Sequence, residues 1–593
     1  MSLLANSPFS SKINSFFSPT EQDLRQIRAT LTEPRARLVQ LDEDIAETEA
    51  TLAALKSQRA ALQLELAPHE SLLAPIRRVP QYILEEIFFA CLPTVHNAVI
   101  DAAEAPLLLR RVNRHWRQVA EATPLLWSSL HICGLKDSEA YHRPYPDPRA
   151  RQPNFQVNTM SGVPPNQSAL RDLIEQYLNW SAGSPLSLSY VERPDHWRTF
   201  PSDNLKRQNA SWEIFEAALK HHDRIKRLDI WAPLWLMNEA VKLAPQEAPA
   251  LRHVRLIVSS GNGMFHGPNS GLSEDVLLES ADSILRKADL TSVFICSQTR
   301  PLELPLIWEN LTHLGLVCEP NYASISSHIA HVAPAGGLDQ NTVYAIFQRC
   351  PNLAHCELAI TVRKELDPAA AAVLLTMASL EHLCLAYLHV NDAPEVDVAH
   401  LLRNVSMPKL RLLRLARSVD FVNLQNISDE KLNYGPEELA VSIDPSQIGI
   451  RFILDILQEL PRTTHLFLIP QEDPNWHTHR NWLTMVGRED PTLFPALTGD
   501  VLCPLLVCVQ INLPVGWMNF RDAGLTAFLR SRSTGPERCL RALTLDFAGD
   551  QKIDVDEELR EIAKAQDSGF ELNLVYTQTP PPNKWIYDPR RGL

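Results

Sequence analysis

LAHCEL, at residues 353–358, and LEHLCL, at residues 380–385, are two copies of one short pattern, apolar-x-x-apolar-x-apolar. Ten copies occur between residues 225 and 545, and consecutive copies start 21 to 53 residues apart. The last two apolar residues of each copy are separated by one residue, so they face the same side of an extended strand. Ten such hexamers in order therefore predict ten buried strands. The other eight are IKRLDI (225–230), LRHVRL (251–256), LTSVFI (290–295), LTHLGL (311–316), LRLLRL (410–415), TTHLFL (463–468), LVCVQI (506–511) and LRALTL (540–545).

Segments with helical periodicity lie between several hexamers, at residues 342–348, 398–404, 451–460 and 556–565. Strand, helix and strand in this order, joined by right-handed crossovers, give an α/β solenoid with parallel strands and outer helices. The hexamers resemble leucine-rich repeats, although a regular array has a period of about 20–29 residues. The resemblance implies an irregular leucine-rich-repeat domain at residues 168–577. A plain α/β domain without solenoid curvature is the alternative.

A second distinctive stretch lies at residues 72–132. Pro80 precedes ILEEIFFACLP, and Pro106 opens a run that reads PLLLRRVNRHWRQVAEATPLLW. In both runs, apolar residues recur at intervals of three and four, which predicts two short amphipathic helices that start near a proline. Two short helices cannot bury so many large side chains between themselves, so we expect a partner surface. An ordinary helical hairpin inside a larger core is the alternative.

This stretch resembles an F-box, and it is most similar to the F-box proteins found in large numbers in fungi. It departs from the pattern at Asn113, where many F-boxes have Cys, and at residues 94–104, which lengthen the loop between the helices. The resemblance implies binding to the Skp-type adaptor of a cullin–RING ubiquitin ligase. The implied adaptor-binding residues are Pro80, Ile83, Leu84, Ile87, Phe88, Val112, Trp116, Val119 and Trp127.

Before this stretch, a heptad repeat can be counted from Leu24 to Leu73, with partner positions that include Leu41 and Leu55. The repeat predicts a coiled-coil helix at residues 21–70, broken at Pro34 and Pro68 and cleanest between residues 36 and 66. Self-association and folding back onto the same chain are two alternatives. The residues that recur every seven positions from Leu24 are Leu24, Leu31, Leu38, Ile45, Leu52, Arg59, Leu66 and Leu73.

Three segments have little apolar periodicity. Residues 1–20 are polar and are predicted to be disordered. Residues 136–167 contain six prolines and are predicted to form a linker or a long surface loop. Residues 578–593 form a tail.

Composition excludes several classes of partner. The net charge of −14 provides no positive field that would attract nucleic acid or an anionic membrane. The chain has no secretory leader and no apolar run of about 18 residues, so we expect neither secretion nor a membrane span. Ten cysteines without framework spacing indicate reduced thiols, as in the cytoplasm or the nucleus.

Catalytic motifs are absent from the sequence. It contains no G-x-S-x-G, H-E-x-x-H, P-loop or paired C-x-x-C, and the glycines at 261–267 do not have the spacing of a nucleotide-binding loop. We therefore expect a non-enzymatic adaptor that uses neither a cofactor nor a metal and that binds an unidentified protein substrate through the repeats. A leucine-rich-repeat scaffold that is not coupled to ubiquitination is the alternative.

The candidate substrate-binding residues fill the third and fifth positions of the hexamers, which point away from the core. They are His253, Arg255, His313, His355, Glu357, His382, Arg414 and His465, and the hexamer at 225 places Arg227 and Asp229 in the same positions.

Histidine fills the third position in five of ten copies. His313, His355 and His382 come from successive copies, so their rings can stack at the strand spacing of about 4.8 Å. Packing on a half-exposed strand is the alternative role. If this row binds the substrate, affinity should change between about pH 6 and 7, although crowded like charges favour neutral rings.

Overall fold

The computed structural model divides into two compact units, Met1–Glu86 and Ile87–Leu593. Each is described by itself below. The described residues are 7–13, 15–73, 75–94, 96–134, 167–192, 212–232, 234–258, 283–297, 300–318, 320–321, 335–362, 364, 366–368, 374–387, 398–416, 437–443, 450–469, 493–498, 501–513, 522–533, 539–548, 555–564 and 570–577. The predicted linker, apart from Gln167, and the predicted tail at residues 578–593 lie outside these ranges.

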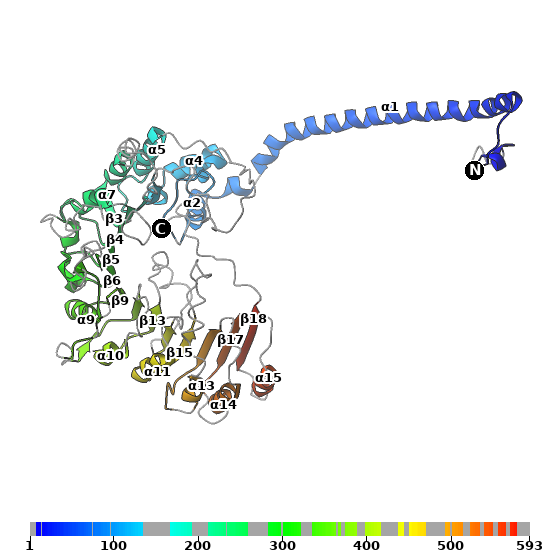
Figure 1. Ribbon diagram of the computed structural model, residues 1–593. Helices are drawn as coiled ribbons and strands as arrows, with labels where there is room; N and C mark the ends of the chain where they lie inside the picture. Colours follow the sequence, from blue (N-terminus) through cyan, green and yellow to red (C-terminus); the bar gives the residue numbers. More distant parts are fainter. Residues whose placement is uncertain are drawn as a thin grey trace, which may run out of the picture. The chain divides into compact units, whose positions relative to one another are not determined.

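The second unit contains one open sheet of 14 parallel strands in chain order, and its helices follow the outer side of the arc that the strands form (Figure 1). The α/β architecture with parallel, solenoid-like strands is therefore confirmed. The strands are β1 (Ser129–Cys133), β2 (Leu186–Val191), β3 (Ile225–Ala232), β4 (His253–Val258), β5 (Ser292–Ser297), β6 (His313–Cys318), β9 (His355–Ile360), β11 (His382–Tyr387), β13 (Leu412–Ala416), β14 (Leu439–Ile443), β15 (Thr463–Leu468), β16 (Cys508–Leu513), β17 (Ala542–Ala548) and β18 (Glu571–Thr577).

All ten hexamers contribute a strand to this sheet, but the sheet is wider than the hexamers predict. Strands β1, β2, β14 and β18 lie outside them, and β1 falls within the stretch that resembles an F-box. The sheet therefore begins at Ser129 rather than after residue 168. Two short strand pairs lie apart from it, β7 (Pro320–Asn321) with β8 (Ala335–Gly336) and β10 (Leu375–Thr376) with β12 (Val405–Ser406).

Helices cover the outer face of the sheet, where the fourth and sixth residues of the hexamers are buried. Leu383 and Leu385 of β11, for example, are almost inaccessible to solvent. The helices are α5 (Gln167–Trp180), one at residues 212–219, α7 (Leu234–Val241), α9 (Gln340–Arg349), α10 (Val398–Arg403), α11 (Ile450–Glu459), α13 (Leu493–Leu497), α14 (Asp522–Ser533) and α15 (Asp556–Lys564).

The length of each repeat decides how its strands are connected. Between β5 and β6 the hexamers start only 21 residues apart, and the connection contains 3-10 turns, η7 (Pro301–Glu303) and η8 (Trp308–Asn310), in place of an α-helix. Longer repeats have room for a helix such as α9, where the Asp339 side chain accepts a hydrogen bond from the Thr342 N–H at 2.8 Å. In the described ranges, the other 3-10 turns of the second unit are η3 (Pro124–Trp127), η5 (His222–Arg224) and η6 (Ile284–Arg286).

Short helices precede the sheet. Helix α2 (Gln81–Ala90) follows Pro80 and crosses the boundary between the units, and α3 (Leu109–Val112) and α4 (Arg114–Glu121) belong to the second unit. Asn113, the departure from the F-box pattern, caps α4, because its side chain accepts a hydrogen bond from the Trp116 N–H at 2.9 Å. Asn113 therefore stabilises the start of α4, which is a local role for this departure from the pattern.

Trp127, one of the implied adaptor-binding residues, is fully buried. Its indole N–H donates to the Ala120 carbonyl at 2.7 Å. Its ring centroid lies 4.8 Å from that of Tyr177 and 4.5 Å from that of Trp180, both on α5. In this structure Trp127 therefore joins the short helices to the first repeat and does not form an exposed surface.

The other implied adaptor-binding residues divide into exposed and covered side chains. Pro80, Ile83 and Val112 are exposed, and Ile87 and Trp116 are partly covered. Leu84, Phe88 and Val119 are buried, and the Phe88 and Trp116 ring centroids lie 5.0 Å apart. Only the exposed members can meet a partner without rearrangement.

The lengthened loop at residues 94–104 packs against the beginning of the sheet. Val99 forms a parallel bridge with His131 of β1. The Asn97 side chain accepts hydrogen bonds from Ser129 at 2.9 Å and Ser187 at 2.8 Å and donates to Ser189 at 2.9 Å. The extra residues therefore fasten the helical region to β1 and β2.

The first unit contains α1 (Glu21–Leu73), a helix of 53 residues. The long helix is confirmed, but the predicted breaks at Pro34 and Pro68 are wrong, because both prolines lie inside it. A proline removes one backbone hydrogen bond, and on a surface helix water can satisfy the carbonyl that is left. A short 3-10 turn, η2 (Pro75–Arg78), follows α1.

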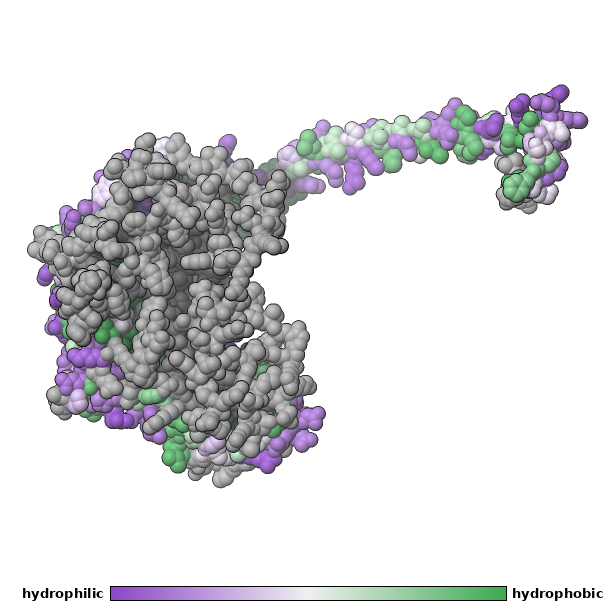
Figure 2. Space-filling model, in the orientation of Figure 1, coloured by the Kyte–Doolittle hydropathy of each residue, from purple (hydrophilic) through white to green (hydrophobic). Residues whose placement is uncertain are grey.

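Apolar side chains are visible along the surface of α1 in Figure 2. Large apolar residues from both heptad positions are exposed in this way, namely Leu38, Leu41, Ile45, Leu52, Leu55, Leu62, Leu66 and Leu73. Val39, Leu64 and Leu72 are also exposed but lie outside these positions. Within the first unit these side chains are exposed to solvent. Self-association and folding back onto the same chain both stay predictions.

Part of the segment predicted to be disordered has a defined structure. Residues 10–12 form η1 (Ser10–Lys12), and the Lys12 Nζ lies 4.1 Å from the centroid of the Phe17 ring. The Thr20 N–H and hydroxyl donate to the Asp23 carboxylate at 2.9 and 2.6 Å, which caps the start of α1. The aromatic contacts and the cap oppose the disorder that the polar composition predicts.

None of the helices in the described ranges combines the length and the apolar character needed to span a bilayer.

Candidate functional site: a groove on the inner face of the sheet

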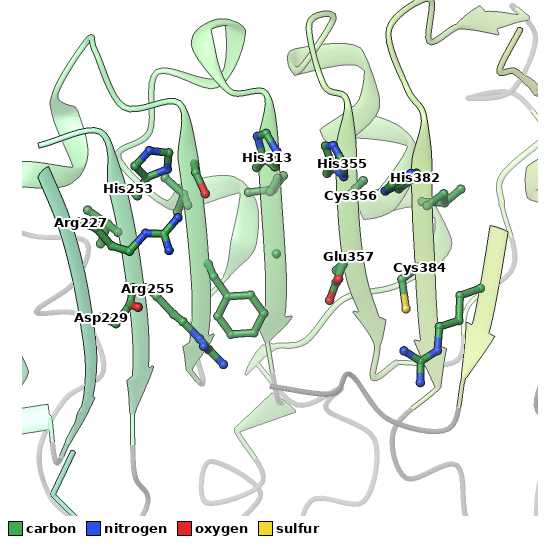
Figure 3. Close-up of a pocket in the computed structure, with 18 of the residues that line it drawn as sticks. Arg227, Asp229, His253, Arg255, His313, His355, Cys356, Glu357, His382 and Cys384 are labelled. Atoms are coloured by element: carbon green, nitrogen blue, oxygen red, sulfur yellow. The ribbon is translucent and has the colours of Figure 1, made fainter. Parts of the chain in front are cut away.

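A groove of about 400 Å³ lies on the inner face of the sheet, opposite the helices, and Figure 3 shows the residues that line it. Its lining comes from seven neighbouring strands, β3, β4, β5, β6, β9, β11 and β13, and from Thr94. Sites for small ligands have volumes of about 300–1,000 Å³. The groove is therefore large enough to receive several side chains of a partner.

The parallel register arranges the lining into two rows, one from each inward-facing position of the hexamers. We call them the histidine row and the charged row. The histidine row consists of Arg227, His253, Ser292, His313, His355, His382 and Leu412. The charged row consists of Asp229, Arg255, Phe294, Gly315, Glu357, Cys384 and Arg414.

Three rings of the histidine row touch one another. The His313 and His355 centroids lie 4.3 Å apart with an interplanar angle of 7°, so these rings are stacked as the strand spacing predicts. His382 lies 4.4 Å from His355 but at 89°, so it meets that ring edge-on. The His313 Nδ1 also lies 2.9 Å from the Thr312 hydroxyl, which helps to hold the first ring in place.

The surroundings favour neutral imidazoles at His253, His313 and His382. Burial lowers the pKa of His313 to about 4, and the neighbouring His355 adds to the effect. Burial, followed by the charge of Arg227, lowers the pKa of His253 to about 4, and burial also lowers the pKa of His382. Neutrality at pH 7 thus agrees with the prediction, but burial rather than like charge is its main cause.

The lowered pKa values predict a loss of stability in acid. A folded-state pKa of about 4 and an ordinary value of 6.5 mean that the unfolded chain binds more protons between these two pH values. The contribution of these neutral rings to the free energy of unfolding should therefore be fully present above about pH 6.5 and should fall as the pH decreases towards 4. Binding in the groove should change little between pH 6 and 7.

The urea midpoint of the second unit, measured at pH 7 and pH 5, tests this expectation. His253→Gln with His313→Gln should make the midpoint less dependent on pH, because glutamine does not titrate. The exposed His115 of α4 provides the control variant, His115→Gln. If the double variant loses as much stability between the two pH values as the wild type, the rings are not the cause.

The charged row contains a buried carboxyl group. Asp229 is 3% exposed, and burial raises its pKa although Arg255 and Arg227 act in the opposite direction. Within the described part of the chain, its Oδ2 accepts no hydrogen bond. This oxygen can therefore accept a hydrogen bond from a bound partner without giving up an internal one.

Phe294 and Gly315 form the middle of the charged row. A Cβ atom on Gly315 would overlap the Phe294 ring, so the ring occupies the space of the missing side chain. The Arg255 guanidinium lies 5.4 Å from the centroid of the same ring. Beyond the ring, Phe294 joins an apolar cluster that includes Ile257, Val317, Ala359 and Ala386. Phe294 therefore connects the lining of the groove to an apolar cluster beside it.

Gly315→Ala is expected to displace the Phe294 ring and to lower the free energy of unfolding by roughly 1–3 kcal/mol, as for other overpacked sites. Urea denaturation measures the change. Gly183→Ala is the matched control, because a Cβ at Gly183 meets no atom within 4 Å. Combining Gly315→Ala with Phe294→Ala should cost less than the sum of the two single changes. Additive costs would mean that the overlap does not constrain the ring.

Seven of the eight candidate substrate-binding residues line the groove. The eighth, His465, is on β15, outside the groove, with its Nδ1 2.9 Å from the Thr464 hydroxyl. The sequence interpretation did not select Phe294, Gly315, Cys384 and Thr94, which also line the groove. The first three fill the fifth position of their hexamers, so position alone would have identified them, whereas Thr94 has no such signal.

Chemistry at the groove is limited by the state of its groups. Burial, followed by the effect of the neighbouring Cys350, raises the pKa of Cys356 well above its usual range, which makes its thiol a poor nucleophile. The described ranges contain no group of three or more His, Cys, Asp or Glu arranged to hold a metal ion. The arrangement favours binding by contact and hydrogen bonds.

Neither the family models nor the curated proteins that we compared with this chain gave a match.

Proposed function

We propose that this chain is the substrate-recognition subunit of a Skp–cullin–F-box ubiquitin ligase and that the groove holds a segment of the target protein. The observation that carries the proposal is the groove itself, to which seven consecutive parallel strands contribute two rows of inward-facing side chains. The chain would supply position and effective concentration, and other subunits would carry out the transfer of ubiquitin.

The dimensions of the groove suit an extended peptide. Seven strands have six intervals of about 4.8 Å, which give roughly 29 Å, the length of about nine extended residues. Such a peptide would cross the strands and meet one inward-facing pair from each repeat. The buried acceptor at Asp229, the half-buried cation at Arg414 and the small exposed part of the Phe294 ring offer the peptide different contacts.

Support for coupling to a ligase comes from the sequence. The resemblance to an F-box covers residues 72–132, and the exposed Val112 lies in it. The loop at residues 94–104 connects α2 to the groove through Thr94 and to β1 through Val99. A fixed connection of this kind would suit a subunit that must hold a target at a defined distance from a catalytic partner.

Affinity purification of the tagged full chain tests the proposal, with mass spectrometry to find adaptor, cullin and targets. We expect the adaptor and the cullin to co-purify. Arg414→Glu, a charge reversal in the groove, should reduce recovery of targets and leave the adaptor and the cullin unchanged. Arg286→Glu, at an exposed residue of η6, is the matched control. Targets recovered without adaptor or cullin would instead favour the scaffold that is not coupled to ubiquitination.

A further inference from the structure

We infer that α1 pairs with the α1 of a second copy of this chain as an antiparallel coiled coil centred between Leu52 and Leu55. The inference does not depend on the proposed function. It starts from the exposed apolar side chains of the helix, among which Leu52 is 50% and Leu55 57% exposed. A row of aliphatic residues at heptad spacing is the seam of a coiled coil, and such a seam needs a second helix.

The order of residues along the seam favours an antiparallel pair. Between residues 38 and 69 the heptad positions read Leu38, Leu41, Ile45, Thr48, Leu52, Leu55, Arg59, Leu62, Leu66 and His69. Thr48 and Arg59 interrupt the aliphatic residues and are the fourth from each end, and a third polar residue, His69, ends the row. Reversing the row therefore places Thr48 opposite Arg59 with aliphatic pairs on both sides, and His69 opposite Leu38 at the end.

A parallel pair in register would bring Arg59 against Arg59 of the second copy in the middle of the seam. Two like charges in a partly dehydrated layer are unfavourable. In the antiparallel pair, each Arg59 meets Thr48 instead, and Leu52 meets Leu55. The Thr48 hydroxyl donates to the Asp44 carbonyl at 2.8 Å, so its oxygen keeps a lone pair that can accept from the Arg59 guanidinium.

Charges beside the seam give the same preference. In the antiparallel register Glu49 faces Lys56 and Arg35 faces Glu70, and both pairs attract, whereas Asp44 faces Glu65 and this pair repels. By symmetry each of the three pairs occurs twice, so four attractive contacts oppose two repulsive ones.

In the parallel register only the pair of Arg37 and Asp42 attracts, whereas Asp44 faces Glu49 and Glu65 faces Glu70. Opposite charges between flanking positions set the orientation of a coiled coil. The antiparallel pair has the better balance.

The register is also specified. Sliding the second helix by one heptad would place Arg59 against Leu41 and Leu52 against Thr48, so each polar residue would meet an aliphatic one. The register centred between Leu52 and Leu55 is the one in which Thr48 and Arg59 face each other. The two prolines do not interfere, because Pro68 lies off the seam and Pro34 lies beyond its end.

Light scattering of the full chain at tens of micromolar tests whether a dimer forms. We expect the mass of two chains. Leu52→Asp should shift the mass to that of one chain, and Ala53→Asp, which places the same charge on the outer side of the helix, should not. A monomeric wild type, or a mass of three or more chains, would overturn the inference. Far-ultraviolet circular dichroism of both variants establishes that α1 remains helical.

A photo-crosslinking amino acid at position 41 tests the orientation. Mass spectrometry of the crosslinked dimer should find attachment near Leu66 of the second copy, because these residues face each other in the antiparallel register. Attachment near Leu41 of the second copy would mean a parallel pair and would overturn the inference. Both results can be read whether or not the chain binds an adaptor, so this test is separate from that of the proposed function.

Discussion

Changing Ile83 to Asp should weaken binding of the Skp-type adaptor by roughly 2–4 kcal/mol, the loss typical of an interface hot spot. Ile83 is 39% exposed on α2 and is one of the residues that the F-box resemblance assigns to the adaptor. A buried carboxylate in an apolar interface would lose its hydration without gaining a partner. Val112→Asp, at a side chain that is 51% exposed, should have a similar effect when tested alone.

Exposed residues make a clearer test than the buried ones beside them. Truncating Phe88 would remove its contact with Trp116 and damage the fold itself, so a loss of binding would have two explanations. Val501→Asp is the matched control, an exposed apolar residue far along the repeats. The measurement is titration of purified adaptor against each variant. If Ile83→Asp and Val112→Asp both bind as well as Val501→Asp, the docking hypothesis is wrong.

Changing Trp127 to Ala is expected to lower the free energy of unfolding by about 3–5 kcal/mol, the usual range for truncating a large buried aromatic side chain. The variant removes the ring that lies between α4 and α5 and leaves the Ala120 carbonyl without its indole donor. Since Trp127 joins the short helices to the first repeat, the helices and β1 should lose structure together.

Urea denaturation with two probes measures this effect, far-ultraviolet circular dichroism for the whole unit and limited proteolysis for cleavage near residue 127. Trp127→Phe should recover part of the loss, because it restores a ring but not the hydrogen bond. Leu125→Ala, at an exposed neighbour, should change little. A midpoint for Trp127→Ala that equals that of Leu125→Ala would show that the ring does not connect the two regions.

The sequence predicted the parallel sheet well because alternate burial along a strand is a local pattern. Each hexamer carries its own evidence, since its fourth and sixth residues must be apolar to face the helices. Strands β14 and β18 were missed because they do not complete that pattern. In β18, for example, the run GFELNL at residues 569–574 has Gly569 where the pattern begins with a large apolar residue, and the strand is only partly buried. Strand β1 does complete it, with WSSLHI at residues 127–132, but this run was assigned to the stretch that resembles an F-box.

The two rows of the groove were also partly predictable, because position within a hexamer decides which face a side chain occupies. The contact between Phe294 and Gly315 was not, since it joins two strands and depends on their register. Trp127 shows the same limit. Its place in the F-box pattern suggested an exposed role, whereas its burial depends on α5, which begins 40 residues later in the chain.

Alternation along the strands has a consequence for how this protein can change in evolution. In each repeat, folding depends on the residues that face the helices, whereas the groove is built from the residues between them. Substitutions in the groove can therefore accumulate one repeat at a time with little loss of stability, which would let related chains diverge in what they bind while they retain the fold. The pair of Phe294 and Gly315 is the exception, because there a change in the lining also disturbs the packing. Descendants of such a chain should vary most along both rows of the groove and least at that pair.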